Sequence, residues 1–535
     1  MAFRVRLGKQ RNPLFRVVPD RLGGSQSQAL GDGCATLSSI SSNRPLGRVL
    51  IRRQIQGRII NSWLVVIAVL GAAIAVADGL TRTPVFEREA YWNGPLEYQP
   101  YLGAVVLASL TLPLMFGYVR QARVPVTEGL FLWFVFCTAA YTRDFSYIHW
   151  PGTPFFVTDI VLAILFLSIY LLARRRDLRV PLPVNVLVAM LVAAGALSAL
   201  RGFLQHCDPI FVLRDAALVA YPLFLYVAHH LARSWLSIKR VALWFLLGTG
   251  LSVLNAFAWF LAAPQERRFI YYGTYILMAL VGTFVAIANR LLRPRTGWML
   301  AGLFCLGLAL ANARSLFVAL PVLLVMGLCT AAIGRRKALR PRMALTTLVA
   351  ATVLISALAL LFLRTEAGRD FAERSAQELA SGVLHSDEDT NWLFRLSAWK
   401  EAWKRFEEYP LAGEGYGIPF VFELLLFDND PRPHNTFLTV LYKMGLIGFL
   451  PLLALIVYFS WRTVGAAYRN VENPRVAWLW IVVLAQVAFC FYGTANLLLE
   501  SPFLASLFWV LMGLGLRMAR MVDLERAVLR TSYGH

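Results

Sequence analysis

Residues 432–450 read RPHNTFLTVLYKMGLIGFL, and they join a long polar segment to a hydrophobic one. Pro433, His434 and Asn435 stand at the junction. A titratable imidazole at the mouth of a membrane helix is costly unless it is used or paired, so His434 is a candidate functional residue. The simpler interpretation, which usually holds for a lone histidine, is an interfacial residue that caps the next helix or bonds a backbone carbonyl. Asn435 is itself a good capping residue, which would leave the imidazole available.

The composition of the chain requires a membrane. Of the 535 residues, 58% are hydrophobic and only 16% are charged, and a soluble domain of this size has no room to bury so much apolar surface. Several apolar runs approach the roughly 20 residues that span a bilayer, and the alternation typical of a membrane β-barrel is absent. We therefore predict an all-α, polytopic transmembrane helical bundle. The six cysteines form no CxxC pair and imply neither a disulfide framework nor a metal site.

Hydropathy divides the chain into five parts. A basic tail at 1–58, predicted to be disordered, precedes transmembrane helices at 59–363, one large polar loop at 364–435, further transmembrane helices at 436–519 and a short tail at 520–535. By the length criterion there are about 12–14 spans. Their approximate limits are 59–80, 101–119, 126–142, 153–173, 183–203, 209–231, 241–263, 270–289, 297–312, 315–333, 343–363, 436–459, 477–498 and 501–519.

The loops between these spans alternate in charge. Every second loop is rich in Lys and Arg, whereas the short loops between them carry few. The positive-inside rule then places the basic loops and both termini in the cytoplasm, and it places the loop at 364–435 on the outer side. The net charge of +21 is spread over these loops rather than gathered on one folded face, so we expect no nucleic-acid partner.

The large outer loop contains one periodic segment, at about 391–409. Glu401 and Arg405 are spaced for an i,i+4 pair, Pro410 ends the pattern, and GEGYG at 413–417 is predicted to be a flexible turn. We expect an amphipathic helix that lies along the outer membrane surface with its tryptophans toward the lipid. Its apolar stripe consists of Leu393, Leu396, Trp399, Trp403 and Phe406.

Several cations at predicted membrane boundaries are candidates for an anion site, and each has a simpler interpretation. Arg314 suits a phosphate group, or it snorkels at a helix end. Arg395 lies beside the apolar stripe, or on the solvated face of its helix. Arg214 adds to an outer anion site, or pairs with Asp215. Lys443 lies beside an anionic head group, or snorkels to the outer surface.

Three motifs together resemble the bacterial O-antigen ligase / O-antigen polymerase superfamily. HNTFLTVLYKMGLIGFL at 434–450 has the His-Asn pair that opens a span and the glycine pair that follows, here Gly445 and Gly448. NARSLFVALP at 312–321 is similar to the Ser-Arg motif of an earlier span, and RLSAWKEAWKRFEEYPLAGEGYG at 395–417 resembles the pattern of the large outer loop. The resemblance covers approximately residues 260–500, and the order of the motifs makes it fairly specific.

The resemblance implies a glycosyltransferase of the GT-C type at the periplasmic face of the bacterial inner membrane, with no metal and no cofactor. Its donor would be a glycan on undecaprenyl diphosphate, and its acceptor a glycan, lipid A–core or a protein. Arg314 and Arg395 would hold the diphosphate, with Arg214 as a further candidate, while His434 would act as base or orient the acceptor hydroxyl. The auxiliary candidates are Arg432, Asn435 and Lys443. The family often has an acidic residue at the position of Lys443.

Arginines that stabilise the leaving diphosphate, opposed to a base that deprotonates the acceptor, predict a single displacement with inversion. One alternative is a polysaccharide polymerase of the same superfamily, although a single large loop favours a ligase. A lipid-linked oligosaccharide flippase would need related halves and a midplane site, which the sequence does not show. A mannosyltransferase-like enzyme would use an acid of the first outer loop, and the candidates are Glu87, Glu89 and Glu97.

Overall fold

The computed structural model describes residues 45–81, 102–149, 155–172, 179–262, 273–311, 319, 320, 323, 326, 390–421 and 432–533. The chain divides into two units, residues 1–55 and 56–535. Of the first unit, only the beginning of helix α1 is described. Because α1 begins at Pro45, it extends into the segment predicted to be a tail.

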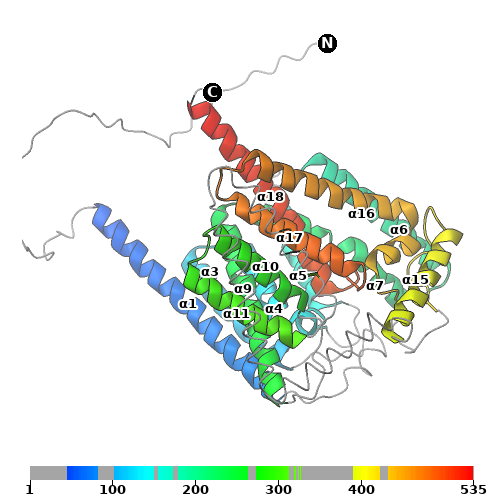
Figure 1. Cartoon of the computed structure of the whole chain (residues 1–535), viewed down its shortest axis with the longest axis horizontal. Helices are drawn as coiled ribbons and strands as arrows, with labels where there is room; N and C mark the ends of the chain where they lie inside the picture. The colour runs from blue at the N-terminus through cyan, green and yellow to red at the C-terminus, as the bar shows by residue number, and fades with distance from the viewer. Residues whose placement is uncertain are drawn as a thin grey trace, which may run out of the picture. The chain divides into compact units, whose positions relative to one another are not determined.

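Helices form all the regular structure in the described part of the chain, as Figure 1 shows. Their bounds are α1 (Pro45–Thr81), α3 (Leu102–Ala122), α4 (Val126–Ser146), α5 (Val157–Leu172), α6 (Leu182–Leu204), α7 (Pro209–Ala220), α8 (Leu223–Leu231), α9 (Trp235–Ala262), α10 (Gly273–Ala288), α11 (Pro294–Ala311), α15 (Thr390–Glu408), α16 (Thr436–Arg469), α17 (Val476–Gly493) and α18 (Pro502–Tyr533). Nine helical segments among these residues are long and apolar enough to cross a membrane. The prediction of a polytopic helical bundle is confirmed, and the chain is a multi-pass membrane protein.

Helices occupy the predicted spans that lie within the described residues. The predicted span at 209–231 is interrupted between α7 and α8 by Tyr221 and Pro222, since proline has no N–H for the helical ladder. The predicted spans at 315–333 and 343–363 lie almost entirely outside the described residues. The full number of spans therefore stays a prediction.

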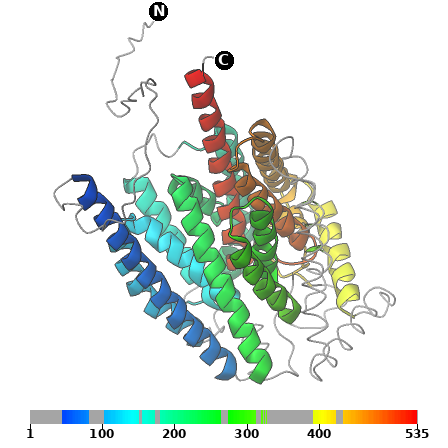
Figure 2. The ribbon, with the colours of Figure 1, turned by 60° about the vertical axis from the view of Figure 1, so that its left-hand side comes forward.

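Close packing between α4 and α9 illustrates how the bundle is held together. The ring of Trp244 meets Tyr118 and Phe136 edge to face, with centroids 5.5 Å and 5.4 Å apart. A Cβ atom at Gly248 would lie 2.4 Å from the carbonyl oxygen of Phe136, so only glycine allows the two helices to approach so closely. Small residues at such contacts let membrane helices gain van der Waals packing energy. Figure 2 shows these helices running side by side.

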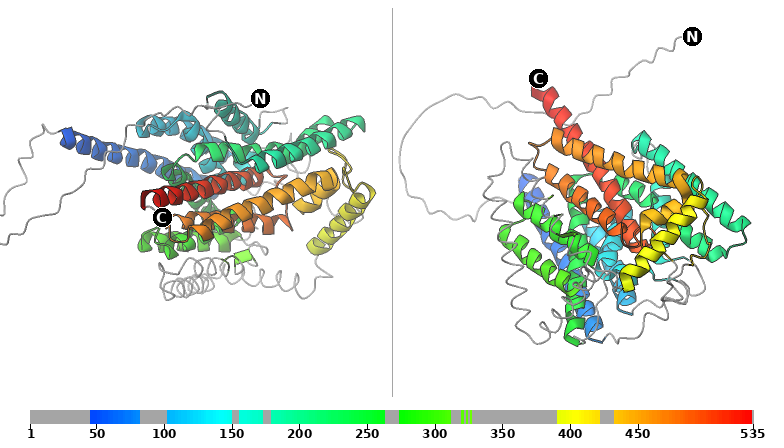
Figure 3. Two further views of the ribbon diagram at one scale, coloured as in Figure 1. Left: turned by 90° about the horizontal axis from the view of Figure 1, so that it is seen from above. Right: turned by 45° about the vertical axis from the view of Figure 1, so that its right-hand side comes forward.

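Helix α15 confirms the predicted helix of the large loop, but only part of its predicted apolar stripe packs on the protein, namely Trp399 and Phe406. Ala398 and Ala402 are buried against the start of α16, together with Phe420. Leu396 and Trp403, both in the predicted stripe, are 42% and 49% exposed. The small side chains of these two alanines allow α15 to approach α16 closely. Figure 3 shows α15, in yellow, at one end of α16.

Arg405 ties α15 to the segment that follows it. Its Nε donates to Glu401 at 2.9 Å, which confirms the predicted i,i+4 pair, and its Nη1 donates to Glu414 at 3.0 Å and to the carbonyl of Pro419 at 3.0 Å. The guanidinium also lies 4.9 Å from the ring centre of Phe420. Burial lowers the pKa of Arg405, but the bonds to Glu401 and Glu414 outweigh this and raise the pKa above its ordinary value. The link therefore keeps its charge.

Candidate functional site

Asn435, and not His434, caps helix α16. The side-chain oxygen of Asn435 accepts hydrogen bonds from the backbone N–H groups of Phe437 and Leu438, both at 3.1 Å. Its backbone is extended, as an N-cap residue requires. The interpretation of His434 as the cap of this helix is therefore wrong, and its imidazole is half-buried.

His434 has a strained backbone. Its φ of +48° lies in the left-handed region, which costs a non-glycine residue about 1–3 kcal/mol. The neighbouring residues hold it there, because the indole N–H of Trp399 donates to the carbonyl oxygen of Pro433 at 2.7 Å and Asn435 is fixed by the helix cap. Strain that the surrounding fold maintains is a common property of functional residues.

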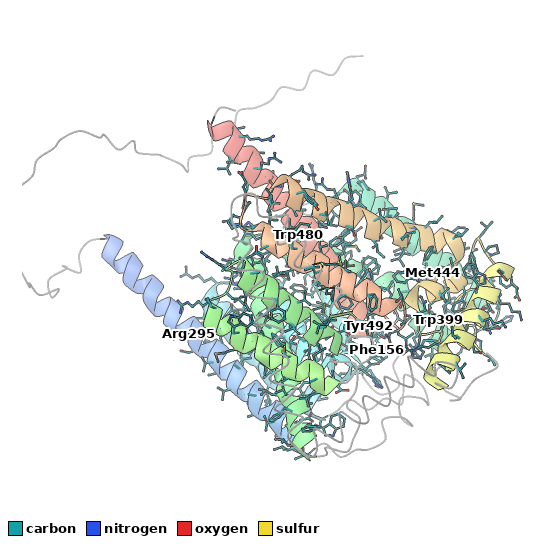
Figure 4. The ribbon with its side chains drawn as sticks, viewed as in Figure 1. Phe156, Arg295, Trp399, Met444, Trp480 and Tyr492 are labelled. Carbon is teal, nitrogen blue, oxygen red and sulfur yellow. The ribbon has the colours of Figure 1, made fainter. Side chains whose placement is uncertain are left out.

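The first turns of α15 cover His434. The ring of Phe394 meets the imidazole edge to face, with centroids 5.9 Å apart. Arg395 directly follows Phe394 and is half-buried, while Arg432 lies two residues before His434 and is buried. The fold thus places Phe394, the neighbour of Arg395, against the segment that carries Arg432 and His434. Figure 4 shows Trp399 and Met444 at the end of α16 that α15 covers.

Glu500 is a residue of this region that sequence reasoning missed. The hydroxyl of Thr436 donates to Glu500 Oε2 at 2.7 Å and accepts the N–H of Leu498 at the same distance. Glu500 is only 8% exposed, and its Oε1 has no hydrogen-bond partner among the described residues. A buried carboxylate oxygen without a partner, held by the residue two positions after His434, is available to a substrate hydroxyl or a proton. An isolated acid in the short loop between two predicted spans was the signal for it.

Residues 410–417, which we call the glycine-rich segment, form hydrogen bonds with the backbone of α16 where that helix is interrupted. Helix α16 kinks at Gly445, and the backbone of the segment pairs with both sides of the kink. Glu414 N–H donates to the carbonyl of Tyr442 at 2.7 Å, and Leu446 N–H donates to that of Pro410 at 2.9 Å. The prediction of a flexible turn at 413–417 is wrong, because the segment is largely buried and supplies bonds that the broken helix lacks.

Two glycines make this insertion possible. Gly413 has a φ of +70° and Gly445 a φ of +61°. A Cβ atom at Gly413 would lie 2.3 Å from the carbonyl carbon of Lys443, and one at Gly445 would lie 2.4 Å from that of Leu411. Neither position accepts a side chain without moving backbone. The kink separates the first turns of α16, next to His434, from the rest of the helix.

The carboxylate next to Arg214 is paired elsewhere. Asp215 Oδ2 lies 2.5 Å from the ammonium of Lys443 and accepts the N–H of Gly417 at 2.8 Å. Lys443 is buried, so the interpretation that it snorkels to the surface is wrong. The alternative in which Arg214 pairs with Asp215 is wrong too. Arg214 is half-buried and forms no hydrogen bond or ion pair with any residue that the structure describes.

Arg314 lies outside the described residues, as do Glu87, Glu89 and Glu97. The expected convergence of Arg314 with His434 and Arg395 therefore stays a prediction. Arg395, Arg432, His434 and Glu500 lie on, or next to residues that contact, the segment that opens α16. Arg214 lies on α7, next to the Asp215 that pairs with Lys443 of α16, and we call these five residues the His434 site. Cations beside an imidazole and a free carboxylate oxygen suit binding of an anionic group and proton transfer.

Comparison with known families gives one match. Residues 299–453 match the family model described as O-antigen ligase, and this supports the O-antigen ligase/polymerase superfamily that the motifs resemble. The matched segment contains α15, the glycine-rich segment and the first turns of α16, with His434. No curated protein matches the sequence.

Proposed function

We propose that this multi-pass membrane protein, which carries an O-antigen ligase domain at residues 299–453, transfers a glycan from undecaprenyl diphosphate to an acceptor hydroxyl. The observation that carries the proposal is the environment of His434. Its backbone is held in a strained conformation, and Asn435 caps the helix in its place. The start of α15, which bears Arg395, covers its imidazole. The matched family is associated with glycosyl transfer, and both the donor and the acceptor are part of the proposal.

The cations of the His434 site would bind the donor diphosphate. As the bond between the anomeric carbon and the diphosphate breaks, negative charge grows on the leaving oxygen, and guanidinium groups in a poorly solvated site stabilise that charge. Arg214 supports this role best, because it is half-buried and no described residue compensates its charge. Arg395 and Arg432 would add to it, and Arg314 is the fourth expected contributor.

His434 would take the proton of the acceptor hydroxyl. The hydroxyl oxygen then forms its bond to the anomeric carbon while the diphosphate leaves with the bonding electron pair, so atoms and charge balance without any further reactant. Attack from the face opposite to the leaving group inverts the anomeric centre. Glu500, through its unpartnered Oε1, would hold the attacking hydroxyl or the imidazole in position.

We place the reaction on the periplasmic face of the bacterial inner membrane. The support is the positive-inside distribution of Lys and Arg, which puts the loop at 364–435 on the outer side together with the His434 site. No nucleotide is available there, so a donor that is already activated by a diphosphate suits the location. The single large loop favours a ligase over a polymerase.

The test uses the purified full-length protein in lipid nanodiscs with an undecaprenyl-diphosphate-linked glycan. Lipid A–core, a free glycan and a protein are offered as separate acceptors, and the product and its anomeric configuration are determined. We expect transfer to one of these hydroxyl acceptors with inversion. Transfer to none of them would contradict the proposal, and retention would contradict the single displacement. Transfer to a growing glycan alone would identify a polymerase in place of a ligase.

A further inference from the structure

A buried ion pair joins α7 to α16 directly beside Arg214. The ammonium of Lys443 and the Oδ2 atom of Asp215 are 2.5 Å apart, and the two side chains are only 6% and 14% exposed. Removal of one partner of such a pair leaves an uncompensated buried charge, which is far more costly than the loss of an exposed pair. The Asp215 carboxylate is therefore strongly held by Lys443, from a helix more than 200 positions away in the chain.

The same carboxylate is also held by the glycine-rich segment. Asp215 Oδ2 accepts the N–H of Gly417 at 2.8 Å, while the carbonyl of Lys443 accepts the N–H of Gly415 at 3.2 Å. The carbonyl of Gly413 accepts the guanidinium of Arg201 on α6 at 2.6 Å. Three helices and the segment thus fix the position of the Asp215 carboxylate, and the Lys443 charge is at the centre of this arrangement.

This arrangement affects the charge that surrounds Arg214. It directly precedes Asp215, and a free carboxylate one residue away would be its nearest source of compensating charge. Lys443 and Gly417 hold the Oδ2 atom of that carboxylate, and no described residue pairs with Arg214. We propose that Lys443 is a positioning residue, which holds Asp215 away from Arg214 and so keeps the Arg214 guanidinium available for the donor diphosphate. This inference rests on the proposed function.

The experiment measures the affinity of the full-length protein in nanodiscs for undecaprenyl diphosphate, together with kcat and the donor KM. In Lys443→Met the released Asp215 turns to Arg214, and we expect affinity to fall about tenfold, with the donor KM rising and kcat little changed. The double variant Lys443→Met/Asp215→Asn removes the competing acid and should restore the affinity. Lys443→Arg keeps the charge and should bind nearly as the wild type does.

A matched control is available at the opposite end of the helices. Arg240 pairs with the buried Glu128 at 3.1 Å. Arg240→Met also breaks a buried pair and should lower thermal stability, but it should leave affinity for undecaprenyl diphosphate unchanged. Wild-type affinity in a folded Lys443→Met protein, or no recovery in the double variant, would overturn the proposal.

A second readout separates this inference from the proposed function. Phenylglyoxal modifies accessible guanidinium groups, and mass spectrometry quantifies the modification of Arg214. We expect less modification of Arg214 in Lys443→Met and recovery in Lys443→Met/Asp215→Asn. If the wild type fails to bind undecaprenyl diphosphate, the proposed function fails, while the modification of Arg214 still decides whether Lys443 controls it. Equal modification in all variants would contradict the role of Lys443.

Discussion

The two ends of the helices differ in how their charged side chains are paired. At the end away from His434, three carboxylates are paired with arginines: Glu128 with Arg240, Asp523 with Arg469 at 3.0 Å, and Glu525 with Arg475. At the His434 end, Arg405 pairs with Glu414 and Lys443 with Asp215, but Glu500 keeps a buried oxygen without a partner among the described residues. Arg214, too, has no counter-charge among those residues. Paired charges hold helices together, whereas charges that the fold fixes without pairing them are available to a ligand.

The largest effect after that of His434 itself is expected from Glu500. The change Glu500→Gln keeps the size of the side chain but removes its charge and its ability to accept a proton. We expect kcat for glycan transfer to fall about 100-fold, since loss of the group that orients the attacking hydroxyl or its base misplaces the reacting atoms. The matched change at the other end, Glu525→Gln, should leave kcat unchanged. Equal activity of the two variants would show that Glu500 has no role in glycan transfer.

A smaller effect is expected from Arg214. In Arg214→Gln the donor diphosphate loses one charge-assisted hydrogen bond, so the donor KM should rise about tenfold. The value of kcat should change less, because other cations remain. Arg469→Gln removes a paired arginine from the opposite end and serves as the control. Steady-state kinetics with varied donor distinguish the two, and an unchanged donor KM in Arg214→Gln would exclude it from diphosphate binding.

The glycine at the kink should affect stability before chemistry. Gly445→Ala places a Cβ atom 2.4 Å from the carbonyl carbon of Leu411 in a left-handed residue. We expect it to lower the free energy of unfolding by about 1–3 kcal/mol, measured by denaturant unfolding in detergent. Gly250→Ala on α9 is the comparison, since its Cβ would meet its nearest neighbour at an ordinary 3.7 Å. Equal stability of the two variants would show that α16 is not held by the inserted segment.

The smallest effect is expected at the paired end. Arg475 and Glu525 form an ion pair in which the side chains are 49% and 30% exposed. Such pairs contribute about 0–1 kcal/mol, so Arg475→Gln should lower the free energy of unfolding by less than about 1 kcal/mol and leave transfer unchanged. A loss of activity in Arg475→Gln, without loss of fold, would contradict the contrast between the two ends.

Local patterns predicted the elements, and distant contacts decided the site. The spacing of apolar residues gave α15 and the i,i+4 pair of Glu401 with Arg405, because both depend on neighbours along one helix. The same stripe did not reveal that Ala398 and Ala402 form the packed face, since this depends on the shape of α16. The periodicity of apolar residues along one helix does not predict which residues of another element that helix contacts.

The candidate site shows the same limit. Asn435 was recognisable as a cap from its type and its position before an apolar run, and this made His434 a candidate. The pairing of Lys443 with Asp215 was not predictable, because nothing local relates α16 to α7. The contact between Thr436 and Glu500 spans 64 positions, so a single sequence offered only an isolated acid between two spans.

The assignment of His434 as the base is tested by comparing glycan transfer in His434→Ala with transfer in His206→Ala. Both histidines have a left-handed backbone, with φ of +48° and +59°, but His206 is exposed and follows α6. Single-turnover transfer from the undecaprenyl-diphosphate-linked glycan is measured for both purified variants. We expect the rate to fall at least 100-fold in His434→Ala and to stay near the wild-type value in His206→Ala. Wild-type turnover by a folded His434→Ala protein would contradict the assignment of His434 as the base.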